Sequence, residues 1–230
     1  MSPSKYDWRK YQLFGNIIHI HAHKCGGTSL RLALELSNPE SPVFEKKPHI
    51  HENEELHEKT PFDIFRVDGW QHASHALPKH IIADIGIDEY MNHTRVTVCR
   101  NPFARVVSMY TYFNKQNKER PRHASFEQFI KEDLAQNGYP RPFPPQKQYM
   151  MYNNEVVVDN ILKLENIQAD WTAFRNKYII NNETIEHRDR IPAEFPLSNR
   201  SNSRGYYRYF KHDPELIEIV TDMYQEDLEY

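Results

Sequence analysis

Residues 13–36 read LFGNIIHIHAHKCGGTSLRLALEL, and this stretch decides the fold. Its first part, Leu13–Ala22, is apolar and rich in β-branched residues, which predicts a strand buried in a parallel sheet. A short turn with two glycines follows, and Thr28–Leu36 then predicts a helix. A strand that leads through a tight turn into a helix is the repeating unit of α/β proteins.

The rest of the chain repeats this alternation. Further strands are predicted at Phe62–Val67, at Arg95–Cys99 and within Val156–Leu164. Helices are predicted over residues 76–85 with an interruption near Pro78, from Pro102 to Asn114, from a capping-box-like Ser125 to Gln136, from a capping Asn166 to Tyr178, and from Asp213 and Pro214 onward. We therefore expect an α/β fold of three layers, with helices flanking a central, mostly parallel sheet. The length suits a single domain over residues 1–230.

The composition excludes several classes of protein. Hydrophobic residues make up 39% of the chain and charged residues 27%, which is typical of a folded protein. The net charge of -3 argues against a nucleic-acid-binding surface, but it allows a local basic pocket for a small polyanion. Two cysteines, Cys25 and Cys99, do not make a disulfide framework. We find neither a signal peptide nor an apolar run of membrane-spanning length. We expect a cytoplasmic protein, and a catalytic domain cut from a longer chain is the alternative.

The turn after the first strand has the features of an anion-binding loop. Gly26 and Gly27 are expected to adopt positive φ and to let the backbone approach a ligand closely. The helix that follows presents unpaired N–H groups, to which Thr28 and Ser29 add hydroxyls and Lys24 adds a mobile charge. The pattern is not a Walker A loop, because G-x-x-x-x-G-K-[ST] is absent. An ordinary strand-to-helix turn with a capping hydroxyl and a surface lysine remains the alternative.

A second segment, Val96–Tyr110 (VTVCRNPFARVVSMY), repeats the same logic. Arg100 lies at the carboxyl end of a predicted strand, where open α/β sheets bind ligands, and its guanidinium suits a phosphate. Ser108 follows about two helical turns later and is a candidate for the same phosphate. Arg105 is expected to bind ligand or to tie the helix to the first loop, with a structural salt bridge as the alternative.

The two segments together resemble those of the PAPS-dependent sulfotransferases, which use 3′-phosphoadenosine 5′-phosphosulfate (PAPS). The resemblance is closest to a carbohydrate branch that includes enzymes like heparan-sulfate 2-O-sulfotransferase. There the first loop typically reads H-I-P-K-T-G-G-T-S, and the second segment V-R-N-P-x-x-R-x-x-S-x-Y. This chain departs from the pattern at His23, where proline is usual, and at Cys25, where threonine is common. Weaker matches at Pro145 and Gln146, at residues 159–166, at residues 198–201 and at residues 223–230 extend the resemblance over most of the chain.

The resemblance implies a fold similar to that of the P-loop NTPases and a set of ligand-binding residues. The 5′-phosphosulfate would be held by the first loop: Lys24, Cys25, Gly26, Gly27, Thr28 and Ser29. Arg100 and Ser108 would hold the 3′-phosphate, and the product would be 3′-phosphoadenosine 5′-phosphate (PAP). The partners would be this nucleotide donor and a hydroxyl acceptor, on a carbohydrate or another molecule, and no metal would be required. The sequence does not name the acceptor, its regiochemistry or the oligomeric state.

Transfer to a hydroxyl needs a general base, and histidine is the usual choice near neutral pH. The segment Asp68–Ala76 resembles a histidine-containing segment of the family, which makes His72 the first candidate and His75 the second. A surface or capping histidine is the alternative for both. His19, His21 and His23 alternate and so share one face of a strand, where they are expected either to pack in the core or to bind zinc.

Two other functions compete with sulfuryl transfer. The first is an ATP-dependent P-loop-like kinase, against which the missing GK[ST] argues. The second is a nucleotide- or glycan-binding domain without catalysis, against which Lys24, Arg100, Ser108 and a candidate base argue.

Overall fold

A computed structural model describes residues 13–35, 75–116, 125–135, 143–183, 185, 187–196 and 205–229. The predicted strand Phe62–Val67 lies outside these residues, and so does the candidate base His72.

The centre of the structure is a four-stranded sheet in the order β1-β2-β3-β6. Strands β2 (Ile17–Ile20), β3 (Thr94–Cys99) and β6 (Asn160–Lys163) are parallel, and β1 (Leu13–Phe14) pairs antiparallel with β2 at one edge. Every residue of β2 is buried. The prediction of a mostly parallel central sheet is therefore confirmed.

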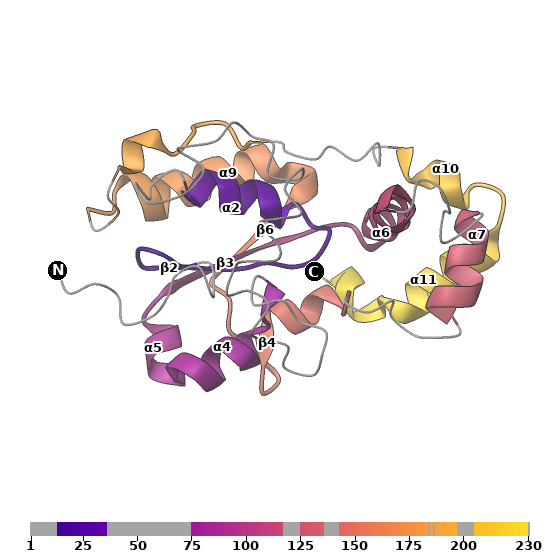
Figure 1. Cartoon of the computed structure of the whole chain (residues 1–230), viewed down its shortest axis with the longest axis horizontal. Coiled ribbons are helices and arrows are strands. Elements are labelled where there is room, and N and C mark those ends of the chain that lie inside the picture. Colours follow the sequence, from indigo (N-terminus) through magenta and orange to yellow (C-terminus); the bar gives the residue numbers. More distant parts are fainter. Residues whose placement is uncertain are drawn as a thin grey trace.

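Helices cover both faces of this sheet (Figure 1). On one face lie α2 (Gly27–Glu35) and α9 (Ile167–Arg175), which the π-helical segment η7 (Asn176–Ile180) continues. On the other face lie α4 (Pro78–Ile85) and α5 (Ile87–Met91). The three-layer α/β arrangement predicted from the alternation of strands and helices is confirmed.

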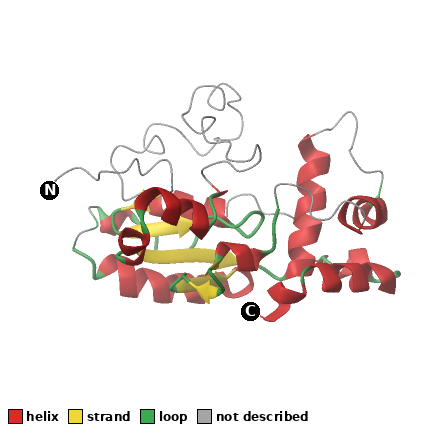
Figure 2. Cartoon of the chain, turned by 90° about the horizontal axis from the view of Figure 1, so that it is seen from below, coloured by secondary structure: helices red, strands yellow, loops and turns green. Residues whose placement is uncertain are grey.

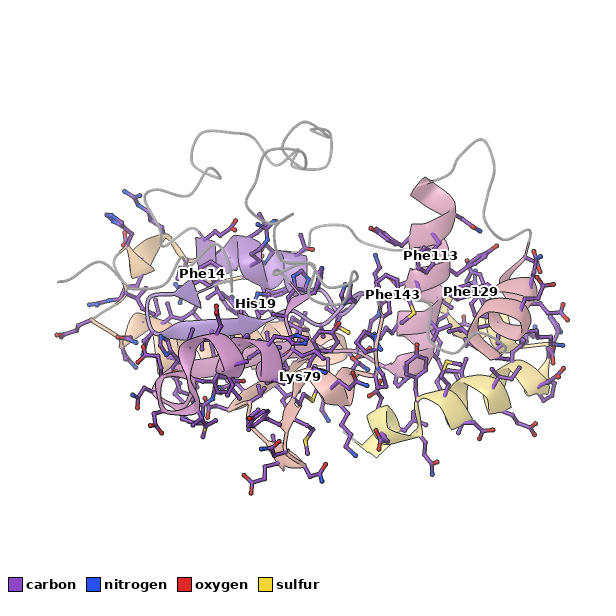
Figure 3. The ribbon with its side chains drawn as sticks, turned by 60° about the horizontal axis from the view of Figure 1, so that its bottom comes forward. Phe14, His19, Lys79, Phe113, Phe129 and Phe143 are labelled. Atoms are coloured by element: carbon purple, nitrogen blue, oxygen red, sulfur yellow. The ribbon has the colours of Figure 1, made fainter. Side chains whose placement is uncertain are left out.

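A group of helices lies beside the sheet rather than over it (Figures 1 and 2). It contains α6 (Pro102–Gln116), α7 (Phe126–Gln128), η4 (Phe129–Leu134), α10 (Tyr207–Phe210), α11 (Pro214–Met223) and η10 (Gln225–Glu229). Aromatic side chains fill its interior: the ring of Phe113 lies 5.3 Å from that of Phe143 and 6.2 Å from that of Phe129 (Figure 3). This apolar cluster is distinct from the one that surrounds the sheet. A single domain over residues 1–230 stays a prediction.

The short elements connect these parts. Strands β4 (Met151–Tyr152) and β5 (Glu155–Val156) form an antiparallel hairpin. Single turns of 3₁₀ helix occur at η5 (Gln146–Tyr149), η6 (Leu164–Asn166) and η8 (Arg188–Arg190).

The first predicted strand is wrong in one respect. Leu13–Ala22 does not form one strand, because Gly15 adopts φ 61° and reverses the chain between β1 and β2. Glycine adopts a positive φ of this kind without the steric cost that a Cβ adds. The Asn16 carbonyl then accepts a hydrogen bond from the Thr94 backbone N–H, which aligns β2 with β3.

Most helix starts follow the predicted capping residues. Ser125 accepts a hydrogen bond from the Gln128 N–H, and Asp213 accepts one from the Glu215 N–H. Pro78 begins α4 instead of interrupting a helix, because a proline in the first turn costs no hydrogen bond. Asn166 precedes α9 as expected, but its side chain caps nothing and donates to Asp170 instead.

Candidate functional site

The loop between β2 and α2 is a tight turn built on left-handed backbone. Lys24 has φ 62° and Gly26 has φ 88°. A Cβ on Gly26 would lie 2.8 Å from Leu164 Cδ1, so both the conformation and the packing favour glycine. The positive φ predicted for Gly26 is confirmed, and its close approach to a ligand stays a prediction.

Gly27 is needed for a different reason from the one predicted. Its φ is not positive, and a Cβ there would lie 2.1 Å from Cδ2 of the His21 ring. No real Cβ contact is that short, so the imidazole of His21 and the start of α2 fit together only because residue 27 has no side chain. The predicted positive φ at Gly27 is wrong.

The first turn of α2 suits an anion. It contains Thr28 and Ser29, and no acidic residue lies within it. The Gly26 carbonyl accepts from the Ser29 N–H over 3.0 Å, so the helix begins at the glycines. A helix start carries the positive end of the helix dipole, which two neighbouring hydroxyls complement without adding negative charge.

Arg100 reaches this loop directly. It follows the last residue of β3, and its Nη1 donates a hydrogen bond to the Lys24 carbonyl oxygen over 3.2 Å. Burial lowers the pKa of its guanidinium. The two segments that the sequence placed at separate strand ends therefore meet at one edge of the sheet. Ser108 is buried on α6, and among the described residues it makes no hydrogen bond to Arg100.

Arg105 ties α6 to the same loop. Its guanidinium is fully buried, donates from Nε to the His23 carbonyl over 3.0 Å and from Nη2 to the Pro144 carbonyl over 2.7 Å. Its Nη1 also lies 3.7 Å from a carboxylate oxygen of Asp227. The sequence left three roles open for Arg105, and the structure shows two of them: the tie between helix and loop, and the salt bridge.

The ammonium of Lys24 lies over an aromatic ring. Its Nζ is 4.0 Å from the centroid of Tyr112 on α6, which is a cation–π distance. The half-exposed Tyr112 thus holds the mobile charge of the loop near the start of α2.

Comparison with known families decides the assignment. A model described as "Sulfotransferase family" matches residues 14–230. The chain belongs to the sulfotransferase family. The fold predicted for that family, a parallel sheet flanked by helices, is the one described above. Searches of curated proteins and of solved structures each found no match.

The family assigns the reaction in general terms. The sulfotransferase is an enzyme that transfers a sulfuryl group, and it needs a nucleotide donor and a hydroxyl acceptor. Among the residues that the structure describes, no helix is both long and apolar enough to cross a membrane.

His75 is the candidate base that the structure describes, and it lies at the glycine loop of the sulfotransferase. Its ring stacks on that of His23 at 3.5 Å between centroids, and its Nδ1 lies 2.9 Å from the His21 carbonyl oxygen. Because a carbonyl only accepts, Nδ1 carries the hydrogen, and the lone pair of the neutral ring is on Nε2. His72 cannot be placed in the same way, since it lies outside the described residues.

The alternating histidines share one face, as predicted. The rings of His19 and His21 stack at 5.2 Å, and His23 Nδ1 lies 2.5 Å from the Tyr149 hydroxyl. Burial lowers the pKa of His19 to about 3 and that of His21 well below its ordinary value, so both rings are neutral. Across the described ranges, no three His, Cys, Asp or Glu side chains form a group that could hold a metal ion. All three side chains are buried, and the rings of His19 and His21 stack on each other, as in the first alternative.

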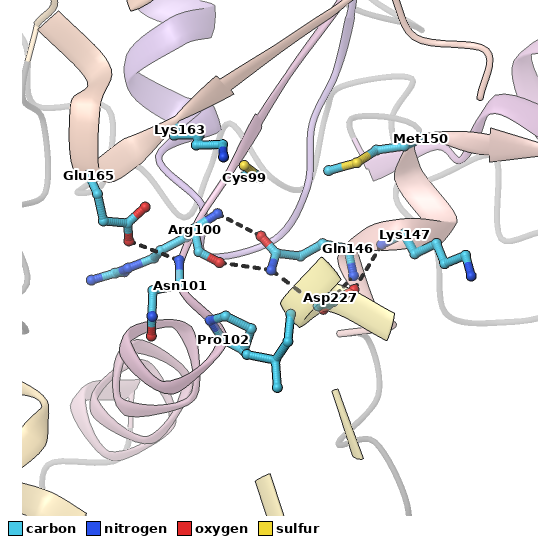
Figure 4. Close-up of a pocket in the computed structure, with 11 residues that line it drawn as sticks. Cys99, Arg100, Asn101, Pro102, Gln146, Lys147, Met150, Lys163, Glu165 and Asp227 are labelled. Atoms are coloured by element: carbon cyan, nitrogen blue, oxygen red, sulfur yellow. Dashed lines mark hydrogen bonds between the residues drawn. The ribbon is translucent and has the colours of Figure 1, made fainter. Parts of the chain in front are cut away.

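A cavity of about 230 Å³ opens at the carboxyl ends of β3 and β6 (Figure 4). Its lining includes Arg100, Lys163 and Glu165, but no residue of the glycine loop. Gln146 and Asp227 also line it, and both contact the loop or its supports. The sequence singled out Gln146 and Asp227 only as members of weak motif matches, at residues 145–146 and 223–230, and did not predict their contacts.

Proposed function

We propose that this sulfotransferase transfers a sulfuryl group from PAPS to a hydroxyl on a carbohydrate. The observation that carries the proposal is the hydrogen bond from Arg100 Nη1 to the Lys24 carbonyl. It joins two separate basic, anion-favouring segments at one sheet edge. PAPS carries a phosphosulfate and a separate 3′-phosphate, and a donor of that kind requires two such sites.

The residues present fit this donor. The first turn of α2 contains Thr28 and Ser29 and carries no carboxylate, and Arg100 donates to the Lys24 carbonyl in the loop just before it. We assign the phosphosulfate to Lys24, Cys25, Gly26, Gly27, Thr28 and Ser29, and the 3′-phosphate to Arg100 and Ser108. The donor supplies the sulfuryl group and leaves as PAP.

In the proposed transfer the acceptor oxygen forms a bond to sulfur while the bond from sulfur to the donor phosphate breaks. Lys24 stabilises the negative charge that develops on the departing phosphate oxygen. The proton of the acceptor hydroxyl passes to a histidine. We keep His72 as the first candidate for that base and His75 as the second, and the stack of His75 on His23, next to Lys24, supports His75.

The carbohydrate acceptor rests on the resemblance of the two segments to the carbohydrate branch of the family. A cytoplasmic location and a single domain are also parts of this proposal.

The test is transfer of labelled sulfate from PAPS to a panel of glycans and small hydroxyl compounds. We expect label in a carbohydrate, and we expect His72→Ala to lose turnover while PAP affinity stays within about twofold. If His75→Ala has that effect and His72→Ala does not, the base is His75. Label that appears only in non-carbohydrate acceptors, or in none, contradicts the proposal.

A further inference from the structure

Gln146 connects the two anion-binding segments through one side chain. Its Oε1 lies 2.7 Å from the Arg100 backbone N–H nitrogen and 3.0 Å from Cys25 Sγ, and accepts from both. Its Nε2 donates to the Arg100 carbonyl over 2.8 Å. The side chain is buried, with 2% of its surface exposed. The carboxamide therefore contacts the glycine loop through Cys25. It also binds both backbone polar groups of Arg100 (Figure 4).

These contacts replace a missing strand partner. Pairing of β3 with β6 ends at Cys99 and Lys163, one residue before Arg100. The Gln146 carboxamide then satisfies the N–H and the C=O of Arg100 as a neighbouring strand would. Only one orientation of the amide forms both hydrogen bonds, because a flip would place Nε2 against the Arg100 N–H and Oε1 against the Arg100 carbonyl oxygen. The backbone that aims the Arg100 side chain is thus fixed by a side chain from η5.

Gln146 is itself held by the carboxyl-terminal segment. Its backbone N–H donates to Asp227 over 2.9 Å, and Asp227 also pairs with Arg105, which donates to the His23 carbonyl. Burial raises the pKa of Cys25 to about 11, so its thiol keeps the proton that it donates. The result is a closed ring of contacts in which the glycine loop, the end of β3 and η10 hold one another.

We infer that Gln146 is a positioning residue that fixes the spacing between the glycine loop and Arg100, and hence the affinity for a nucleotide with both a 5′- and a 3′-phosphate. The inference rests on the proposed donor. Gln146 touches neither phosphate; it acts through the backbone of Arg100 and through Cys25.

The test is a calorimetric titration of the full chain with PAP, for the wild type, Gln146→Met and Gln168→Met. Methionine has nearly the shape of glutamine but cannot replace its hydrogen bonds. Gln168 is the matched control, because its amide also links a backbone N–H, that of Phe195, to a backbone carbonyl, that of Ala193, and neither of these belongs to the two anion-binding segments. We expect Gln146→Met to weaken PAP binding about 10- to 100-fold, and Gln168→Met to change it less than about twofold.

The variant Gln146→Glu distinguishes a role in positioning Arg100 from a role in the stability of the fold alone. It keeps the acceptor for the Arg100 N–H but loses the donor to the Arg100 carbonyl, except when the new carboxyl is protonated. Burial and the neighbouring Asp227 should raise the pKa of that carboxyl more than the Arg105 guanidinium lowers it. PAP affinity relative to wild type should therefore recover by about fivefold or more between about pH 8 and about pH 6. A role in folding alone would not produce this recovery. This variant also decides the matter if Gln146→Met does not fold.

The outcomes are distinct. Wild-type protein that binds no PAP overturns the proposed function and this inference together. If the wild type binds PAP and Gln146→Met binds it with an affinity within about twofold, this inference alone is overturned. The same holds if PAP affinity depends on pH in Gln146→Glu as it does in the wild type.

Discussion

Arg100 donates a hydrogen bond from Nη1 to the carbonyl oxygen of Lys24, over 3.2 Å and across 76 positions of sequence. This contact places a guanidinium against the turn whose glycines precede α2. Parallel strands make it possible, because β2 and β3 end at the same edge of the sheet. The basic residues Lys24 and Arg100 therefore lie at the same edge of the sheet, although each belongs to a different strand-to-helix connection.

Arg100→Ala should lower the affinity for PAP about 30-fold or more, because it removes a charged partner of the 3′-phosphate. Binding of AMP, which lacks that phosphate, should change much less. Arg188→Ala is the control, since Arg188 also donates from Nη1 to a backbone carbonyl, that of Asn182, at 3.1 Å. Calorimetric titration of the wild type and both variants with PAP and with AMP gives the six affinities. An equal loss for PAP and AMP would mean that Arg100 supports the loop but does not bind the 3′-phosphate.

Lys24→Met should lower kcat for sulfuryl transfer by about 100-fold or more and change PAP affinity less. The reason is that the Lys24 ammonium acts mainly on the negative charge that develops on the departing phosphate oxygen during transfer. Lys177→Met is the matched control: its ammonium also lies over an aromatic ring, that of Tyr178, at 4.7 Å. Steady-state kinetics with labelled PAPS give kcat and KM for each variant. An unchanged kcat for Lys24→Met would remove this lysine from the chemical step.

The layers of the fold could be predicted from sequence because they depend on local patterns. Buried β-branched runs gave β2 and β3, and the capping residues Ser125 and Asp213 gave two helix starts. The hairpin at Gly15 was missed, because its two flanking apolar segments form one continuous run in sequence. The separate helical group was also missed, since apolar spacing shows that a helix buries one face but not what that face meets.

Gly27→Ala should destabilise the fold by about 2 kcal/mol, because the new Cβ would overlap the His21 ring. In a His21→Ala background most of this loss should disappear, as expected for two residues in direct contact. Gly86→Ala is the control, because Gly86 has φ 88° and no atom lies within 4 Å of its Cβ position. The stability that Gly86→Ala loses therefore comes from backbone strain, which His21→Ala should not relieve. Urea unfolding measures the wild type, the three single variants and the two double variants with His21→Ala. Additive effects of Gly27→Ala and His21→Ala would contradict the contact.

Stability should fall as the pH falls below neutral, and His19 should account for part of the slope. Its pKa is about 3 in the folded protein and 6.5 as the ordinary value, because burial disfavours the charged ring. Between these values the unfolded chain binds the extra proton, so acid favours unfolding by about 1.4 kcal/mol per pH unit for this one group. His19→Leu should remove that share of the slope in urea unfolding at several pH values. A slope identical to that of the wild type would mean that His19 is protonated in the folded state.

The candidate site could be predicted in part. Lys24, the glycines and Arg100 were named from motifs, and the structure brings them together because parallel strands end side by side. Gln146 and Asp227 lie in weak motif matches, but their roles could not be predicted, since these depend on contacts across 46 and 81 positions that no local pattern encodes. The two glycines illustrate the same limit: the sequence predicted a shared reason for both, whereas one needs its φ and the other needs space for a histidine.

The most direct measurement compares the binding of PAP and of AMP to the wild-type protein under identical conditions. If both segments hold phosphate, PAP binds at least about tenfold more tightly than AMP, because each charged hydrogen bond to the 3′-phosphate contributes more than 1 kcal/mol. Equal affinities, or binding of neither nucleotide, would show that Arg100 and the glycine loop do not form one donor site.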